Sequence, residues 1–250
     1  MSGRLPDFLG LGVQKGGTTT LHRLLERHLS VFLPPVKEVH YFSLHFAEGD
    51  AWYRHQFAPA AQEQRCGEIT PYYLFHPEVP KRVHALLPKA RLIVLLRDPV
   101  ERALSQYFHS RRLGFEPLRL EEALAVEPDR LSSAAAVLRV ANGKHQSHQE
   151  HSYLSRSRYD QQIPAWEALY PAAQLLVLRS EDLFSRPAEI WLRVLEFLEL
   201  PGCPLPEMVT PANAGRGESS AVSEEVRHHL RELLQPTYEW AAERYHVEWK

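Results

Sequence analysis

Cysteine is almost absent from this chain of 250 residues, which carries only Cys66 and Cys203. The two lie far apart and form no closely spaced pair, so the sequence offers neither a disulfide framework nor a zinc-binding pattern. This composition is compatible with a reducing compartment. We therefore expect a fold that depends on its hydrophobic core.

An excess of charge of one sign is also missing. Lys and Arg together number 29 and Asp and Glu together number 31, which gives a formal net charge of −2 at pH 7. This balance does not call for nucleic acid or an anionic membrane as a partner. Any anion site in the chain must therefore be a local one.

Long hydrophobic runs are lacking as well. No stretch of roughly 18 apolar residues occurs, so we expect no transmembrane helix. The apolar run at residues 8–13 is short, is interrupted by Gly10 and Gly12, and lacks a small-residue cleavage pattern, so we expect no signal peptide. The expectation is a cytoplasmic protein without membrane association.

The chain does have enough apolar residues, 44% of the total, for one globular domain, which we expect to span residues 1–250. Short β-prone runs alternate with helical patterns. The successive pairs are 8–13 with 19–28, 91–96 with 99–112, and 175–178 with 187–198. Such alternation predicts an α/β fold with three layers, α/β/α, around a central parallel sheet.

The helix expected at residues 99–112 has a well-defined start. Asp98 stands as its N-cap, Pro99 takes the first helical position, and Glu101 stands where a capping box needs it. The start of this helix, and the end of the strand before it, are therefore predicted with residue accuracy.

Two later regions are less regular. Residues 114–153 show a weak pattern and residues 139–158 are polar and mostly basic, so two interpretations of 114–158 stay open, a solvated insertion and a lid over the substrate. From residue 222 to 245 a mixed-charge amphipathic pattern predicts a closing C-terminal helix, which Pro236 breaks or kinks.

The strongest local signal is the run GVQKGGTTT at residues 12–20, between a predicted strand and a predicted helix. Glycines let the backbone wrap around an anion, the helix N-terminus supplies free N–H groups, and Lys15 adds positive charge. The run therefore indicates a P-loop-like phosphate-binding loop, with an ordinary glycine turn as the alternative. Because Lys15 precedes Gly16 and Gly17, the Gly-Lys-[Ser/Thr] order of a Walker A loop is absent, which argues against a conventional P-loop NTPase.

A second signal is the apolar run at residues 91–96, which ends on Arg97 and leads into the capped helix. Arg97 is thus expected at the carboxyl edge of the sheet, where open α/β folds bind ligands. Ser105 lies two turns into the helix and is placed to face the same anion. Taken alone, an arginine here would more often pair with Glu101, and it is the combination with the glycine-rich loop that favours an anion site.

These two segments resemble the phosphosulfate loop and the 3′-phosphate motif of the sulfotransferases that use 3′-phosphoadenosine-5′-phosphosulfate (PAPS). Three further stretches match in the same order, namely KEVHYF at 37–42, GEITPYY at 67–73 and QLLVLRSEDL at 174–183. The resemblance covers roughly residues 7–200. It is closest to the heparan sulfate N- and O-sulfotransferase branch, in a small, bacterial-type, single-domain form.

The resemblance implies transfer of a sulfuryl group from PAPS to the hydroxyl or amine of a small molecule or saccharide, with 3′-phosphoadenosine-5′-phosphate (PAP) as the product. It places Lys15 near the oxygen that bridges phosphorus and sulfur, and Arg97 and Ser105 at the 3′-phosphate. The residues implied to cradle the 5′-phosphosulfate are Gly16, Gly17, Thr18, Thr19 and Thr20. No metal is expected, because Lys15 and the helix N-terminus would supply the charge that Mg²⁺ supplies in kinases.

The same resemblance implies the general base. Glu38 matches the catalytic glutamate of the family and His40 matches an assisting histidine. Residues two apart on an extended segment point the same way, which is consistent with a pair. Without the family, the ordinary interpretation of Glu38 would be a solvated charge beside Lys37.

Two positions match less well. Ile69 stands where the heparan sulfate branch has a lysine, and this departure argues against a polyanionic glycosaminoglycan as the acceptor. Arg216 lies in a stretch that resembles the late basic loop of the family, which closes over the 3′-phosphate and the adenosine.

Two other functions stay open. An ATP-dependent kinase of P-loop type would need an acid at a strand end to hold its metal, and the candidate, Asp98, is expected to cap a helix. A non-catalytic protein that binds 3′-phosphoadenosine nucleotides would keep the pocket without turnover, and the presence of Glu38 argues against it.

Overall fold

The computed structural model describes residues 3–206 and 217–249. Within them, one sheet of five parallel strands has the order β2-β3-β1-β4-β5. The strands are β1 (Phe8–Gly12), β2 (Val31–Phe32), β3 (Arg65–Ile69), β4 (Arg91–Leu96) and β5 (Leu175–Arg179). The predicted α/β fold with a central parallel sheet is confirmed.

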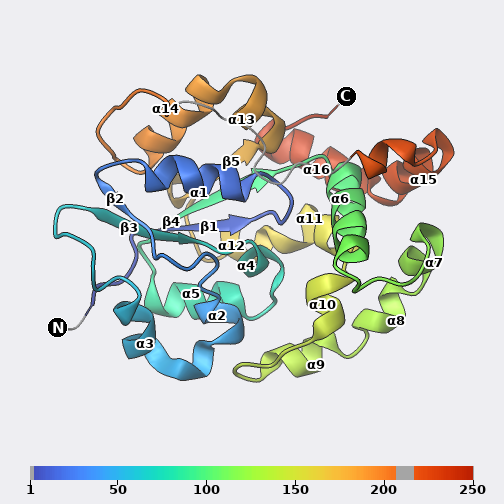
Figure 1. Ribbon diagram of the computed structural model, residues 1–250, viewed down its shortest axis with the longest axis horizontal. Coiled ribbons are helices and arrows are strands. Elements are labelled where there is room, and N and C mark those ends of the chain that lie inside the picture. Colours follow the sequence, from blue (N-terminus) through green and yellow to red (C-terminus); the bar gives the residue numbers. More distant parts are fainter. Residues whose placement is uncertain (1–2, 207–216, 250) are drawn as a thin grey trace.

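Helices cover both faces of this sheet (Figure 1). One face packs its apolar side chains against α1 (Thr18–Glu26), α13 (Ser180–Ser185) and α14 (Pro187–Phe197). The opposite face packs against α2 (Tyr41–Leu44), α3 (Gly49–His55), α4 (Tyr72–Phe75), α5 (Val79–Leu86), α6 (Pro99–Arg112), α11 (Tyr159–Gln162) and α12 (Pro164–Glu167). Three layers result, as the alternation of strands and helices predicts.

The capped helix begins and ends where the sequence indicates. Oδ1 of Asp98 accepts the N–H of Glu101 at 2.9 Å, and Pro99 is the first residue of α6. The Glu101 carboxylate turns to Arg227 and not back to the cap, so only the first half of the expected capping box is realised. Because Asp98 fixes the first turn, α6 starts directly at the carboxyl end of β4.

The C-terminal region contains two helices and not one. Helix α15 (Glu224–Leu233) and helix α16 (Gln235–Tyr245) meet at Leu234, and Pro236 lies in the first turn of the second. A proline tolerates that position because its missing N–H has no partner there in any case. The predicted break is confirmed, and a short 3₁₀ turn, η4 (Glu218–Ala221), precedes the pair.

Residues 114–158, which we call the insertion, are helical. They form α7 (Leu120–Ala125), α8 (Glu127–Leu131), α9 (Ala134–Arg139), α10 (Gln146–Glu150) and the 3₁₀ turn η2 (Ser155–Ser157). Two further 3₁₀ turns lie outside it, η1 (Phe46–Glu48) and η3 (Ala172–Gln174). No helix in the described parts of the chain is long and apolar enough to cross a membrane.

Candidate active site

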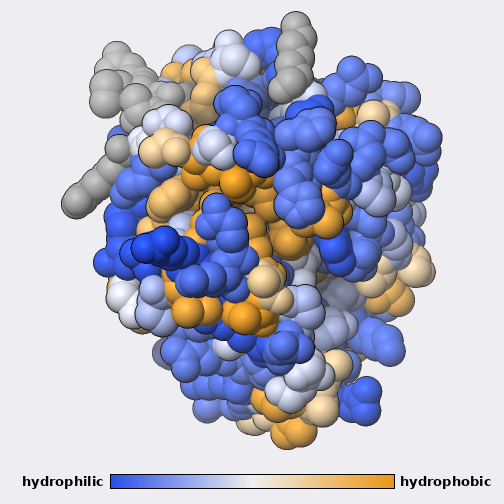
Figure 2. Space-filling view, turned by 90° about the vertical axis from the view of Figure 1, so that its right-hand side faces the viewer, coloured by the Kyte–Doolittle hydropathy of each residue, from blue (hydrophilic) through white to orange (hydrophobic). Residues whose placement is uncertain are grey.

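All five strands point their carboxyl ends to the same edge of the sheet, because they are parallel. The chain crosses from one side of β1 to the other between β3 and β4, which makes this edge the topological switch point where open α/β sheets bind ligands. Seen from the side of Figure 1 toward which β1 points, hydrophobic residues gather in the middle of the face and hydrophilic residues surround them (Figure 2).

A cavity of about 530 Å³ lies at this edge. It draws side chains from segments far apart in the sequence. Its lining comes from the glycine-rich loop (Gln14, Lys15, Gly17, Thr18, Thr19), from β4 and α6 (Arg97, Glu101, His109), from α13 (Ser180, Glu181, Phe184), and from Glu38 and Pro71. Motifs that the sequence only places in order are thus brought together in space.

Residues 12–20, which we call the phosphate loop, are held by close backbone approaches. The N–H of Val13 bonds to the carbonyl of Leu95 at 3.0 Å, and a Cβ on Gly16 would come within 2.8 Å of that same carbonyl oxygen. Gly17 has a φ of 85°, in the left-handed region, and begins α1. Glycine is therefore required at both positions, by space at Gly16 and by backbone conformation at Gly17.

Lys15 lies among other cations. Burial, and then the charges of Arg112, Arg97 and Arg102, lower its pKa to about 8. The Arg97 guanidinium donates to the Lys15 carbonyl at 3.0 Å and lies 4.0 Å from the Glu101 carboxylate. An anion bound in the cavity would offset the repulsion among these cations and would favour the charged form of Lys15.

One face of α6 continues this side of the cavity. Glu101 and His109 both line it, and Ser105 lies midway between them, one helical turn from each. Burial and the charge of Lys15 lower the pKa of His109, so its ring favours the neutral form. The structure therefore places Ser105 on the same face as the groups that line the cavity.

Glu38 lines the cavity, and His40 lies beside it without belonging to the lining. Nε2 of His40 is 3.2 Å from the Glu38 carboxylate, and Nζ of Lys37 is 3.3 Å from it. Burial acts to raise the pKa of Glu38, but the hydrogen bond from His40 and the charges of Lys37 and His40 outweigh it and hold the pKa below its ordinary value. At neutral pH the carboxylate is ionised and can accept a proton.

The other acids of the cavity already have partners. Glu101 pairs with Arg227, and Glu181 accepts the N–H of Asp98 at 3.0 Å and the indole N–H of Trp249 at 2.9 Å. Neither carboxylate contacts Lys15, so the phosphate loop keeps its positive character.

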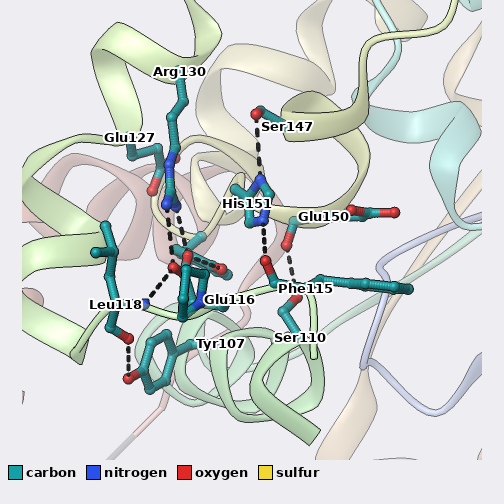
Figure 3. Close-up of polar contacts among 12 residues, drawn as sticks. Tyr107, Ser110, Phe115, Glu116, Leu118, Glu127, Arg130, Ser147, Glu150 and His151 are labelled. Carbon is teal, nitrogen blue, oxygen red and sulfur yellow. Dashed lines mark hydrogen bonds and ion pairs between the residues drawn. The ribbon is translucent and has the colours of Figure 1, made fainter. Parts of the chain in front are cut away.

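Buried polar contacts cross-link the insertion, and the hydroxyl of Ser110 in α6 attaches it to the sheet-covering helices by donating to the carbonyl of Glu150 at 2.7 Å (Figure 3). The Glu116 carboxylate, fully buried, holds Arg130 of α8 and the hydroxyl of Tyr153 at 2.7 Å. Glu127 accepts the N–H groups of Leu154 and Ser155 at 2.9 and 2.7 Å. The interpretation of 114–158 as a solvated insertion is therefore wrong for residues 151–157, most of which are buried, whereas residues 139–147 are exposed or half-buried.

Arg156 connects the insertion to the phosphate loop. It is 3% exposed, donates to the carboxamide of Gln14 in the phosphate loop, and stacks on Tyr72 and Phe75 with its Cζ 5.1 and 5.0 Å from the ring centres. It also bonds to the carbonyl of His148 at 3.1 Å. A basic residue that the sequence places on a polar surface thus lies buried behind Gln14.

Not all of the predicted residues line the cavity. Gly16 and Thr20 are buried beneath the cavity surface, and the carbonyl of Gly16 accepts the Ser180 hydroxyl at 2.8 Å. Ile69 is 2% exposed and packs in the core on the α1 side of the sheet, so its side chain does not face the cavity. Arg216 lies outside the described residues. The inference that Ile69 removes a substrate-contacting charge therefore has no support in the geometry.

Several cavity residues were not predicted as site residues from the sequence. They are Gln14, Glu101, His109, Ser180, Glu181 and Phe184. The stretch at 174–183 marks the place of Ser180 and Glu181, because it matches the family, and Phe184 follows directly after it, but the match assigns them no role. Helical spacing from Ser105 would have indicated Glu101 and His109, which stand four residues away on either side.

A second cavity, of about 440 Å³, lies at the opposite, amino end of the sheet. Its two arginines, Arg65 and Arg91, both pair with Glu199, so their charges are already engaged within the protein. Among residues 3–206 and 217–249, no group of three or more His, Cys, Asp or Glu side chains is arranged to hold a metal ion.

Comparison with known proteins gives consistent matches. The model of the sulfotransferase domain family matches residues 5–212. Heparan sulfate glucosamine 3-O-sulfotransferase 6 of Homo sapiens is 32% identical over 79% of this chain and 53% of its own length. Membrane-associated sulfotransferase kil1 of Dictyostelium discoideum is 27% identical over 78% of this chain and 56% of its own. The chain thus spans about half the length of these curated relatives.

Solved structures show the same fold. The sulfotransferase from Alicyclobacillus acidocaldarius superposes with a TM-score of 0.81 at 23% identity, covering 98% of both chains. Mouse sulfotransferase SULT7A1, solved in complex with PAP, superposes with a TM-score of 0.50 at 15% identity, covering 95% of this chain and 65% of its own.

Proposed function

The chain belongs to the sulfotransferase domain family, and on this premise we propose that it moves a sulfuryl group from PAPS to an acceptor hydroxyl or amine. The acceptor oxygen or nitrogen forms a bond to sulfur, and the bond from sulfur to the bridging phosphate oxygen breaks. The proton of the acceptor passes to Glu38, and PAP leaves. No redox partner is required by this balance.

One observation carries the proposal. The phosphate loop, Arg97 and Glu38 come from three separate segments and line a single cavity. An in-line transfer needs an anion-binding side that stabilises the leaving phosphate and a base on the acceptor side. Lys15 supplies the charge for the first need, and the ionised Glu38 supplies the base for the second.

The donor is oriented by the same groups. The 5′-phosphosulfate binds at the phosphate loop, where Gly16, Gly17 and Thr18 lead into α1 and the N–H groups of the helix start are available. Arg97 and Ser105 take the 3′-phosphate, at the start and on the cavity-facing side of α6. The PAP complex of SULT7A1 supports a nucleotide of this kind.

The acceptor is a small molecule or a saccharide. Saccharide chemistry is suggested by the names of the relatives, which act on heparan sulfate glucosamine. The chain spans only about half of those relatives, so their full substrate does not carry over with the fold. The acceptor must reach Glu38, which lies at the Pro71 side of the cavity lining.

A kinase is less consistent with the geometry. Its metal would require a free acid at a strand end, and both oxygens of Asp98 lie 3.0 Å from the Tyr238 hydroxyl while Oδ1 also caps α6. A non-catalytic nucleotide-binding protein would have no use for the Glu38 and His40 pair, which stands ready to accept a proton.

Calorimetric titration with PAP and with AMP tests the proposed donor. PAP should bind far more tightly, because each charge-assisted hydrogen bond to a 3′-phosphate is worth roughly 1.5–3 kcal/mol. The variant Arg97→Ala should lose most of this difference and leave AMP binding nearly unchanged. Equal affinities of the wild-type protein for the two nucleotides would reject the assignment of Arg97 and favour the kinase. Labelled PAPS offered with alcohols, phenols, amines and sugars then identifies the acceptor class.

A further inference from the structure

The turn that carries the proposed base is held by hydroxyl groups. We call residues 37–42 the base turn. The N–H of His40 points to Oγ1 of Thr70 at 3.5 Å, and the N–H of Phe42 points to the hydroxyl of Tyr73 at 3.3 Å. His40 has a φ of 55°, so its backbone stays in the left-handed region and depends on its surroundings to remain there.

Both hydroxyls donate to one buried carboxylate. Thr70 donates to Oε2 of Glu68 at 2.7 Å and Tyr73 donates to Oε1 at 2.9 Å. Tyr53 also donates to Oε1, at 2.7 Å. Glu68 is 2% exposed, and all the partners described for it are hydroxyl groups of the core.

The direction of these hydrogen bonds follows from elementary chemistry. Burial raises the pKa of Glu68, and the three hydroxyl donors oppose this shift because they stabilise the ionised form. An ionised carboxylate can only accept, and a hydroxyl has a single proton to donate. Because Thr70 and Tyr73 donate their hydrogen bonds to Glu68, their oxygens keep lone pairs free to act as acceptors. The N–H groups of His40 and Phe42 donate to these lone pairs. Glu68 therefore sets the polarity of both hydroxyls and so the attachment of the base turn.

We propose that Glu68 is a positioning residue that acts through Thr70 and Tyr73 to hold the Glu38 and His40 pair in its reactive geometry. The inference rests on the proposed function, in which Glu38 is the general base. It gives a role to the buried glutamate of the 67–73 stretch, which touches neither donor nor acceptor. The network should matter for the transfer rate and not for PAP binding, because it contacts the base turn and not the phosphate loop.

The chain offers a matched pair of tyrosines to test this. Tyr53 and Tyr73 are both fully buried, and both donate to the same oxygen of Glu68. Only Tyr73 also accepts an N–H of the base turn, from Phe42. Phenylalanine keeps the ring packing in both places, including the stacking of Tyr53 on Tyr41 at 4.3 Å between ring centres.

The experiment compares Tyr73→Phe with Tyr53→Phe, and Thr70→Val with the conservative Thr70→Ser. Melting temperature, PAP affinity by calorimetry and kcat for transfer from PAPS are measured on each. We expect the two tyrosine variants to lose similar thermal stability and all four to keep PAP affinity. The kcat should fall about ten- to hundredfold in Tyr73→Phe and Thr70→Val, since small misplacements of reacting groups cost this much. Tyr53→Phe and Thr70→Ser should stay within a few-fold of the wild type.

Equal losses of kcat in Tyr73→Phe and Tyr53→Phe, or in Thr70→Val and Thr70→Ser, would overturn the positioning role and leave Glu68 as a core residue only. If one tyrosine variant does not fold, the threonine pair decides alone. Glu38→Gln is measured beside them. If Glu38→Gln retains transfer, the base assignment fails and the positioning role fails with it. If Glu38→Gln is inactive but Tyr73→Phe and Tyr53→Phe lose kcat equally, only the positioning role is rejected.

Discussion

The phosphate loop and the base turn line the same cavity, yet different interactions hold them. Backbone groups and side chains of the cavity lining both hold the phosphate loop. Val13 bonds to the carbonyl of Leu95, and the side chains of Arg97 and Ser180 donate to the carbonyls of Lys15 and Gly16 at 3.0 and 2.8 Å. Side chains of distant segments hold the base turn, namely Thr70, Tyr73 and Arg82, whose guanidinium donates to the carbonyl of Phe42 at 2.9 Å. The donor side is thus held by backbone groups and by side chains that themselves line the cavity, whereas the base side is held by side chains behind the cavity lining.

This difference decides what mutations should do. A substitution in the phosphate loop should directly change the charge there and the binding of the nucleotide. A substitution behind the base turn should act indirectly, by shifting the Glu38 and His40 pair that it does not contact. Three substitutions and one change of pH test this contrast.

Glu38→Gln should keep the fold and PAP affinity but lower transfer to an alcohol acceptor by about 10²–10⁴. Glutamine is nearly isosteric and accepts hydrogen bonds, but it is a negligible base. A phenol ionises more readily than an alcohol and should be less sensitive. Rates measured with labelled PAPS on wild type, Glu38→Gln and the exposed control Glu48→Gln check this. Transfer within a few-fold of wild type would remove Glu38 as the base and make His40 the next residue to test.

Lys15→Ala should lower the transfer rate by about 10²–10³ and PAP affinity by less. The reason is that the lysine charge acts mainly on the oxygen that becomes negative as the bond to sulfur breaks. Single-turnover rates and PAP titrations on the same variant separate the two effects, with Lys89→Ala at the far end of the sheet as the control. A loss found entirely in affinity would restrict Lys15 to ground-state binding.

Arg130→Met should destabilise the fold by about 3 kcal/mol, because it leaves the buried Glu116 carboxylate without its cation. The matched control is Arg186→Met, which removes an exposed guanidinium and leaves Asp182 paired with Arg179, so it should cost much less stability than Arg130→Met. Urea denaturation measures both. PAP affinity should change little, since Arg130 pairs with Glu116 and not with the phosphate loop. A parallel loss of PAP affinity would show that the insertion supports the phosphate loop, to which it connects through Arg156 and Gln14.

The sequence was informative where structure is local. The strand at 91–96, the helix at 99–112 and its cap at Asp98 have the predicted bounds, because periodicity and capping depend on neighbouring residues. The phosphate loop was found for the same reason. Its residue types, with Gly16 and Gly17, are dictated by backbone space and backbone conformation.

The strand β3 and the insertion escaped prediction for one shared reason, which is buried polarity. β3 reads RCGEI and lacks an apolar run, because Glu68 is buried there among hydroxyl groups. Arg156 resembles a surface residue in a polar segment, yet it lies behind Gln14. The sequence pattern does not distinguish a buried charged residue that pairs with a distant partner from a charged residue in solvent. The burial of Glu68 and Arg156 could therefore not be predicted from residue type.

The smallest effect concerns pH and belongs to the donor side. Burial and the charges of Arg112 and Arg97 lower the pKa of Lys15 to about 8 in the free protein. A bound phosphate favours the charged lysine and raises that pKa, so above about pH 8 the complex holds a proton that the free protein has lost. Binding then takes up a proton, and PAP affinity falls as the pH rises, by at most about tenfold per pH unit.

Calorimetry with PAP near pH 7 and near pH 9, in two buffers of different ionisation enthalpy, measures both the affinity and the proton uptake. The phosphates of PAP contribute little to the proton uptake between these two pH values, because the second ionisation of a phosphate monoester has a pKa of about 6. Lys15→Arg is the control, since a guanidinium stays charged throughout and should make the affinity almost independent of pH. An affinity of the wild-type protein that stays flat between the two conditions would mean that the Lys15 ammonium does not contact the bound nucleotide, and the contrast between a charged donor side and a packed base side would lose its main support.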